Sequence, residues 1–412
     1  MSESNFIVSK CTLIPNGASL EEEYEISAGY QHLNYFESIE SPSISMTLTF
    51  HDIDQVIGRK GITGGELIEV TVRDGTEGDQ LKITKEHRMI LNAVVNMNTT
   101  SQVQEATLHF VSEETFINET ARLNKKFTGN VSQTVEDILT KDEKGIKTQK
   151  ELFGTEDNET RAVNSYSFIG NLKRPFDTIQ WLCPKAQSAN DDFGFLFFEN
   201  LDGYHFKSIK TLLNQESIKY TFSDRPLEQP TILQNELKQS NDIGMNLRMG
   251  MYANKTIYVD IENQEAEVID FDANKDLNLE KKAKLNKLEE KPTRLMYRIN
   301  DSGVSQKGSE RDKKDPKTSL AVYQNKSYIR NNLLFSQAMA ISIPLNVLLR
   351  AGDVIDIELP LKKGDGDKPV DSTGNDKTND PSGKYLICEL RHLIGGGKGE
   401  TQLKLIRDVF TA

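Results

Sequence analysis

The stretch Ala351-Gly-Asp-Val-Ile-Asp-Ile-Glu-Leu359 decides the fold expected for this chain, together with the two segments that follow it. Those segments are Lys384-Tyr-Leu-Ile-Cys-Glu-Leu-Arg-His392 and Glu400-Thr-Gln-Leu-Lys-Leu-Ile-Arg407. Apolar and polar residues alternate in all three, which is the period of a half-buried β-strand. Gly395-Gly-Gly-Lys-Gly399 separates the last two segments and predicts a hairpin turn, because glycine accepts the positive φ of tight turns.

The same pattern occurs near the start of the chain, where 64–72, 89–95 and 105–112 match the three later segments in order. The aligned pairs are Gly65 with Gly352, Ile68 with Ile355, Ile90 with Leu386, Glu105 with Glu400, Leu108 with Leu403 and Phe110 with Leu405. The gap between the second and third segments differs by about one residue, and the gap between the first and second is about nine residues longer in the later copy. We therefore predict a duplicated antiparallel β-barrel module of the tube type in a mainly β chain.

The composition describes an acidic chain with small cores. It has 412 residues, a net charge of -12, 36% hydrophobic residues and a mean hydropathy of -0.53, which predicts about two to four compact units. The negative charge disfavours a general affinity for nucleic acid or an anionic membrane. The sequence has no apolar run of membrane-spanning length and no signal peptide at Met1-Ser-Glu-Ser-Asn5. Three widely spaced cysteines, Cys11, Cys183 and Cys388, predict reduced thiols in a protein made in a cytoplasm.

Four regions follow from the changes of pattern along the chain. We predict a first β-barrel module at 1–113, a small α+β insert with an aromatic hairpin at 114–220, a second β-barrel module formed by 221–250 and 331–412, and an inserted charged domain or connection at 251–330. In the α+β insert, Asn130 is a predicted helix cap, Pro175 a predicted first helical residue, and Asn200-Leu-Asp-Gly203 a predicted hairpin turn. Further predictions are helices at 277–288 and 329–340, a polar loop at 302–317, and a mobile loop at 362–382.

Several stretches resemble ligand-binding motifs, but their residue spacing does not match that of the motifs. Gly395-Gly-Gly-Lys-Gly-Glu-Thr401 resembles a phosphate loop, but its lysine is followed by glycine and both flanks predict strands. The acids of 365–380 lack the spacing and the closing Glu of a calcium loop. His51-Asp-Ile-Asp54 is best interpreted as a solvated turn. The cations Arg350, Arg391, Lys404 and Arg407 stand among acids, which indicates a salt-linked face rather than a nucleic-acid groove. We therefore predict no catalytic, cofactor-binding or metal-binding residues.

The order of barrel, α+β insert and second barrel is similar to that of the baseplate hub protein of contractile-tailed bacteriophages of the T-even type, and to the hub part of type VI secretion spike proteins. Three stretches carry the resemblance: 127–139, which resembles the family's linker and first insert helix; 193–215, with its aromatic hairpin and Leu213-Asn-Gln215; and 345–407, with Arg350-Ala-Gly-Asp353 before a Tyr-Leu-Ile strand. The segments 251–320 and 362–382 depart from the family pattern.

The resemblance implies a structural role in the virion. Members of this family form a homotrimer in which six similar barrels make a pseudo-six-fold ring, which adapts a six-fold tail tube to a three-fold central spike around a channel for DNA. The implied partners are the spike, the tail tube or tube initiator, and baseplate wedge components, and the implied location is the tail baseplate after assembly in the host cytoplasm.

The resemblance implies a structural role without enzyme activity, and the charge, apolar runs and motifs of the sequence predict no cofactor, no membrane insertion and no specific nucleic-acid binding. An acidic channel wall that repels DNA is a further hypothesis, since the chain is acidic. Two alternatives remain open at this point: a cell-wall-degrading tail enzyme, and the hub of a type VI secretion spike.

Overall fold

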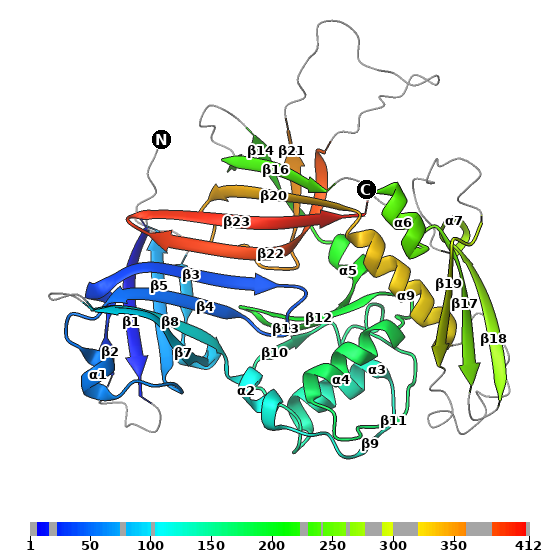
Figure 1. Cartoon of the computed structure of the whole chain (residues 1–412), viewed down its shortest axis with the longest axis horizontal. Coiled ribbons are helices and arrows are strands. Elements are labelled where there is room, and N and C mark those ends of the chain that lie inside the picture. The colour runs from blue at the N-terminus through cyan, green and yellow to red at the C-terminus, as the bar shows by residue number, and fades with distance from the viewer. Residues whose placement is uncertain are drawn as a thin grey trace, which may run out of the picture.

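The computed structural model describes residues 6–15, 23–74, 80–99, 104–222, 230–239, 242–260, 264–276, 291–299, 320–359 and 381–408. The chain is mainly β, with a 15-stranded sheet, two three-stranded sheets and a two-stranded sheet in this part. The helices lie below and to one side of the large sheet (Figure 1). Among the described residues, no helix is both long enough and apolar enough to cross a bilayer. The predicted mobile loop at 362–382 falls mostly outside the described residues, as do the helix at 277–288 and the polar loop at 302–317.

The first strand set comes from the N-terminal part of the chain and is ordered β3-β4-β8-β7-β5-β1-β2, with β6 beside β5. Its strands are β1 (Phe6–Ile14), β2 (Tyr24–Glu25), β3 (Tyr30–Ser38), β4 (Ser45–His51), β5 (Leu67–Asp74), β6 (Gln80–Ile83), β7 (Met89–Thr99) and β8 (Gln104–Ser112). A short helix α1 (Val56–Lys60) and the 3-10 turns Ser27–Gly29 and Lys85–His87 connect them. The last strand in this order, β2, pairs with β1. The chain then passes through the turn at Ser27–Gly29 directly into β3, which is the first strand in the order.

The second strand set is ordered β16-β20-β23-β22-β21-β14-β15. Its strands are β14 (Ser217–Phe222), β15 (Thr231–Ile232), β16 (Gln234–Gln239), β20 (Gln337–Pro344), β21 (Val354–Glu358), β22 (Gly383–Gly395) and β23 (Lys398–Arg407). Only Leu233 separates β15 from β16, and its N–H donates to Ser342 O of β20 at 2.8 Å. The last strand in this order, β15, is therefore continuous with the first, β16.

The two strand sets pair in equivalent registers. Leu67 of β5 lies opposite Ile90 of β7, and the matching pair in the second set is Val354 opposite Leu386. The next pairs, Ile90 with Val111 and Leu386 with Ile406, are equivalent as well. Both ladders then shift register at the same place, between Leu91 and Ala93 and between Ile387 and Glu389.

The turn before the first matched strand is also the same. Gly65 and Gly352 have φ values of 93° and 94°, which favour glycine. The N–H of Gly65 donates to Leu91 O at 2.8 Å, and that of Gly352 donates to Ile387 O at 2.9 Å. The sixth strands differ, because β1 is antiparallel to β5 whereas β14 is parallel to β21. The equivalence therefore covers five strands: β3, β4, β8, β7 and β5 against β16, β20, β23, β22 and β21.

One contact joins the two strand sets into a single sheet. The second half of β22 pairs antiparallel with β3, from Glu389 opposite Ser38 to Gly395 opposite His32. Figure 1 shows these two strands side by side at the middle of the molecule. The approach is close at Gly395, where a Cβ atom would lie 2.2 Å from the His32 ring.

The α+β region packs beneath this junction. Its elements are α2 (Glu113–Thr120), β9 (Lys126–Phe127), α3 (Val131–Glu136) with a π-helical turn at Asp137–Lys141, β10 (Glu151–Phe153), β11 (Phe168–Ile169), α4 (Pro175–Leu182) with a 3-10 turn at Cys183–Lys185, β12 (Phe195–Asn200), β13 (Gly203–Ser208) and α5 (Ile209–Leu213). Asn130 caps α3, with its Oδ1 accepting from Gln133 N at 2.8 Å. Pro175 begins α4, and the β12–β13 hairpin turns at Leu201 and Asp202. All three local predictions for this region are confirmed.

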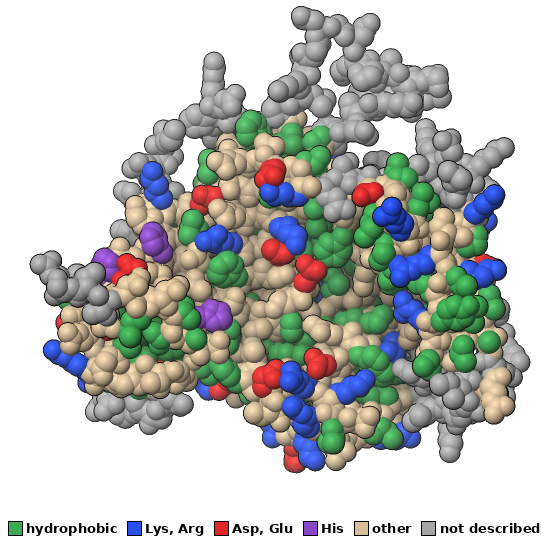
Figure 2. Space-filling model, viewed as in Figure 1, with side chains coloured by type: hydrophobic (Ala, Val, Ile, Leu, Met, Phe, Trp, Pro, Cys, Tyr) green, Lys and Arg blue, Asp and Glu red, His purple; other side chains and the backbone are tan. Residues whose placement is uncertain are grey.

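A small sheet stands at the side of the molecule, made of β17 (Ala253–Asp260), β18 (Glu265–Asp272) and β19 (Arg294–Ile299). The helices near it are α6 (Ile243–Met249), α7 (Ala273–Asp276) and α9 (Leu320–Leu334). Hydrophobic side chains gather on the exposed face of this sheet (Figure 2), among them Val268, Leu295, Tyr297 and Ile299.

The structure corrects two boundaries. The helix predicted at 329–340 is confirmed only as far as Leu334, because α9 ends there and β20 begins at Gln337. Met339, Ile341 and Ile343 are buried and alternate with half-buried neighbours, which is a strand period. The α+β insert was predicted to extend to residue 220, but β14 begins at Ser217 and pairs with β21 of the second strand set.

Candidate functional site: the face across the strand-set junction

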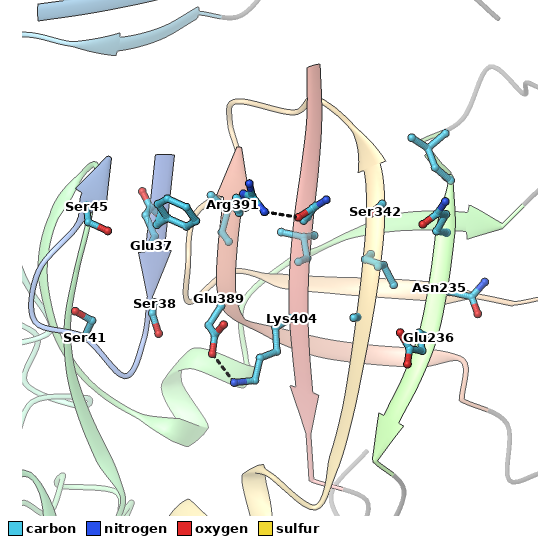
Figure 3. Close-up of a pocket in the computed structure, with 18 of the residues that line it drawn as sticks. Glu37, Ser38, Ser41, Ser45, Asn235, Glu236, Ser342, Glu389, Arg391 and Lys404 are labelled. Atoms are coloured by element: carbon cyan, nitrogen blue, oxygen red, sulfur yellow. Dashed lines mark hydrogen bonds and ion pairs between the residues drawn. The ribbon is translucent and has the colours of Figure 1, made fainter. Parts of the chain in front are cut away.

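The junction between β3 and β22 carries one continuous surface, which we call the junction face. It consists of side chains on β4, β3, β22, β23, β20 and β16 that alternate with residues of the core. They are Asn34, Phe36, Ser38, Ser45, Thr47, Gln234, Glu236, Ala340, Ser342, Glu389, Arg391, Gln402 and Lys404. The face is hollowed, with a cavity of about 920 Å³ lined by most of these residues (Figure 3).

A ladder of side-chain hydrogen bonds crosses the junction perpendicular to the strands. Asn34 of β3 donates to Thr47 Oγ1 of β4 at 3.2 Å. On its other side, Asn34 Oδ1 accepts from Arg391 Nε at 3.1 Å and from Arg391 Nη2 at 2.8 Å. The Arg391 guanidinium also lies over the Phe36 ring, 5.5 Å from its centroid. Arg391 therefore ties the two strand sets together on the junction face, because planar guanidinium groups favour paired and stacked contacts.

The charges on the junction face are mixed in sign and largely engaged. Lys404 pairs with Glu389, and its Nζ lies 3.7 Å from Glu40 Oε2. Figure 3 shows Lys404 and Glu389 pointing toward each other across neighbouring strands. Hydroxyl and amide groups occupy most of the remaining positions. The face is therefore neither strongly acidic nor strongly basic, and at Arg391 and Lys404 it fits the predicted salt-linked face.

A buried carboxylate lies beneath the junction and holds three parts of the chain. Glu37 is 2% exposed. Its Oε1 accepts from Tyr35 Oη at 2.7 Å and from Leu201 N at 2.8 Å, and its Oε2 accepts from Ala351 N at 2.7 Å. These donors come from β3, from the β12–β13 turn and from the turn before β21. Burial raises the pKa of Glu37 to about 7, although Arg350 and the three donors favour the charged form.

An aromatic pair fills the core side of the same junction. Tyr35 of β3 and His392 of β22 are fully buried and stacked, with ring centroids 5.9 Å apart. His392 Nδ1 lies 2.9 Å from Thr401 Oγ1. Burial lowers the pKa of His392 to about 3, so its imidazole is neutral and acts as a packing group rather than a proton carrier at neutral pH.

A second buried polar cluster fastens the α+β region to the first strand set. Lys150 is 10% exposed, and its Nζ lies 2.7 Å from Glu114 Oε2 and 2.6 Å from Glu199 Oε1. Glu199 Oε2 accepts in addition from Ser112 Oγ at 2.6 Å and from Ile44 N at 3.1 Å. Burial raises the pKa of Glu199, which Lys150 opposes. Because every carboxylate here is engaged by donors, the cluster suits a structural joint better than acid–base chemistry.

The described residues offer one group of possible metal ligands, and it does not fit a metal. Glu40, Cys388 and Glu389 have ligand atoms within 4.8 Å of one another. Lys404 already pairs with both glutamates. Burial raises the pKa of the Cys388 thiol, which disfavours the thiolate that a metal requires. We assign this group to an ion-pair cluster.

Two of the motifs dismissed from the sequence lie in the described residues, and one of them takes the expected structural role, whereas the acids of 365–380 lie outside the described residues. The 395–399 stretch forms the β22–β23 turn. Asp52, predicted in a solvated turn, is instead 3% exposed, and its carboxylate accepts from Val56 N at 2.6 Å and Ile57 N at 3.0 Å at the start of α1. The sequence analysis missed Glu37, Lys150 and Glu199. The only signal for Glu37 was an acid at an inward position of an alternating strand.

Comparison with known proteins places the fold. No family model and no curated protein matches the sequence. A solved tail protein from Neisseria meningitidis aligns with a TM-score of 0.56 and 10% identity, over 99% of this chain and 98% of that chain. The chain shares the fold of a tail protein. The 43 kDa tail protein of a Shewanella oneidensis prophage aligns with the same TM-score at 9% identity, over 97% of this chain and 98% of that chain.

A component of the type VI secretion system of Escherichia coli also aligns, with a TM-score of 0.46 and 11% identity over 92% of this chain and 73% of that chain. The two tail proteins are matched over nearly their full lengths, so the alignment extends over both strand sets and the α+β region of this chain.

Proposed function

We propose that this protein is the structural hub at the tip of a contractile phage tail, where it adapts a six-fold tail tube to a three-fold central spike. The observation that carries the proposal is the equivalence of the two strand sets in strand order, register, register shift and glycine turn. Three copies of a chain with two equivalent units present six similar surfaces around one axis. A ring of this kind can contact a six-fold partner on one side and a three-fold partner on the other.

Each strand set is proposed to be a tube-type β-barrel module. The return of both strand orders to their own starting strands supports closure of each module into a barrel. The two strand sets meet at one junction, and buried groups such as Glu37 hold the chain segments around that junction together. This arrangement suits a rigid segment of a ring. The full-length fold similarity to solved tail proteins supports the placement in a tail.

In this proposal the junction face lines a central channel through which DNA passes. Its paired charges and its many hydroxyl and amide groups support this role, because affinity for the DNA backbone depends on unpaired cations. Passage therefore does not require the acidic wall suggested by the net charge. We propose the spike, the tail tube or its initiator, and wedge components as partners, with the protein located in the virion baseplate after assembly in the host cytoplasm.

The oligomeric state in solution tests this proposal. Size-exclusion chromatography with light scattering should give a particle of three times the chain mass of 46.5 kDa. Electron microscopy of negatively stained particles should show a ring with six similar lobes around a channel. A protein that stays monomeric at micromolar concentration, alone and with its spike, would overturn the proposal.

We also propose that the chain itself is not an enzyme. The buried carboxylates Glu37, Glu114 and Glu199 are all engaged by donors, which supports a structural role for them. Clearing of a cell-wall substrate in a zymogram of the purified protein would contradict this.

A further inference from the structure

Among the strand edges that lack a partner in the described part of the chain, one from each strand set stands out, on β7 and on β16. Residues 93–99 of β7 pair with β8 on one side, and no described strand lies on the other. β16 pairs with β20 on one side and has no described strand along the other. We call these the β7 edge and the β16 edge. Figure 1 shows them well apart in one chain, with β16 near the top and β7 at the lower left.

The positions equivalent to these two edges are paired with each other at the junction. By the register of the two ladders, the β7 edge corresponds to 389–394 of β22, with Ala93 at Glu389, Val95 at Arg391 and Asn98 at Leu393. The β16 edge corresponds to β3, because Leu237 lies opposite Met339 as Tyr35 lies opposite Met46. β3 and β22 pair along these stretches. The chain thus contains one edge-to-edge contact, between β3 and β22, and leaves unpaired the two edges that could form the equivalent contact.

The two edges expose apolar side chains where the junction buries its own. Met97 is 53% exposed and Leu237 is 45% exposed. In the register of the junction, Leu237 takes the place of Tyr35, and Met97 lies in the register shift that takes the place of His392. Tyr35 and His392 are fully buried and stacked on each other. Burial of Met97 against Leu237 would complete the same arrangement with an aliphatic pair.

The residues of the β7 edge are also unusual for a strand edge that stays exposed to solvent. Its sequence Ala93-Val-Val-Asn-Met-Asn-Thr99 has no charge and no proline. Exposed edges of soluble proteins usually carry such residues, because a bare edge pairs with other chains. The β16 edge carries Glu236 and Lys238, and neither meets a like charge on the uncharged β7 edge. The paired residues of the two edges therefore bring no like charges together at this contact.

We propose that the β16 edge of one copy pairs antiparallel with the β7 edge of the next, as β3 pairs with β22 within the chain. The register places Leu237 opposite Met97, Glu236 opposite Asn98 and Asn235 opposite Thr99. The contact is head-to-tail, so each copy offers one edge and receives the other, and a ring forms when the rotation closes. This inference rests on the proposed hub ring and deepens it, because it names the surface that joins its copies and extends the junction face from one chain to the next.

Disulfide trapping between chains tests the contact. Met97→Cys and Leu237→Cys are purified separately, mixed under conditions that allow exchange, and oxidised with oxidised glutathione. The native cysteines are buried, which keeps the background low. The mixture should give a covalent pair of chains on a non-reducing gel, and each variant alone should not. The variant with both substitutions in one chain should give a covalent trimer.

Lys238→Cys is the matched control for direction, because Lys238 pairs with Glu236 of the junction face, whereas Leu237 takes the place of the core residue Tyr35. Its mixture with Met97→Cys should cross-link several-fold less than the Leu237→Cys mixture. A trimer in solution without the Met97–Leu237 cross-link overturns the contact and leaves the hub ring standing. A monomer overturns both. Cross-linking of Met97→Cys to itself indicates a two-fold contact and also overturns the inference.

A charge substitution gives an independent readout. Leu237→Asp should weaken association by about ten-fold or more, because it buries an unpaired charge in the contact. The control is Ile169→Asp on β11, where the side chain is 56% exposed and remote from both edges. Light scattering across a dilution series should show that only Leu237→Asp dissociates, and equal behaviour of the two variants would count against the contact.

Discussion

Replacing Lys150 with methionine tests the buried joint between the α+β region and the first strand set. The Lys150 ammonium contacts two carboxylates at 2.7 and 2.6 Å, and their side chains are 5% and 0% exposed. At an effective dielectric constant of about 20, each contact supplies about 6 kcal/mol of attraction, most of which offsets the cost of burying the charges. Lys150→Met leaves Glu114 and Glu199 buried without their cation, so we expect a loss of about 3–5 kcal/mol in the free energy of unfolding.

Guanidinium denaturation followed by circular dichroism, at one fixed protein concentration, measures this loss. Adding Glu199→Gln to Lys150→Met should recover about 1–2 kcal/mol, because it removes one uncompensated charge. The control is Lys219→Met: Lys219 lies 2.8 Å from Glu358, and the two side chains are 59% and 56% exposed. It should cost far less than Lys150→Met, because solvent screens an exposed ion pair. If Lys150→Met costs no more than Lys219→Met, the buried joint does not stabilise the fold as argued.

Three further predictions concern separate features. Burial raises the folded pKa of Glu37 to about 7, so its stabilising contribution is largest below pH 4.5 and falls as pH rises to 7. Relative to wild type, Glu37→Gln should therefore gain up to about 3 kcal/mol across that range, and a pH-independent difference in unfolding free energy would contradict this. Gly352→Ala should destabilise by about 1–3 kcal/mol in thermal melts, because φ is +94° and a Cβ would lie 2.7 Å from Phe198 Cζ; Gly58→Ala, in open space within α1, should be neutral or slightly stabilising. Thiol reagents should label the native protein slowly and the unfolded protein at three sites, since burial raises the thiol pKa values of Cys11, Cys183 and Cys388; rapid labelling of the native fold would refute it.

Local and periodic features were accessible from the sequence alone. Alternation identified the strands of the repeated pattern, β5, β7, β8, β21, β22 and β23, and alignment on Gly65 and Gly352 anticipated the register that the two ladders adopt. These predictions succeed because strand period and turn glycines depend on neighbouring residues and on steric limits of the backbone. The prediction fails at 337–340, where Gln337-Ala-Met-Ala suits a helix locally. Pairing of β20 with both β16 and β23 decides that it is a strand.

The sequence by itself determined that this chain is mainly β and contains a repeated three-strand pattern. Only the tertiary structure decided how the two strand sets meet, because the pairing of β3 with β22 joins residues more than 350 positions apart, as Asn34 and Arg391 illustrate with a separation of 357. The same holds for Glu37, whose N–H donors lie 164 and 314 positions away along the chain. A carboxylate at an inward position has no predictable role until the fold brings its donors to it, whereas alternation and turn chemistry act over a few residues and can be read from them directly.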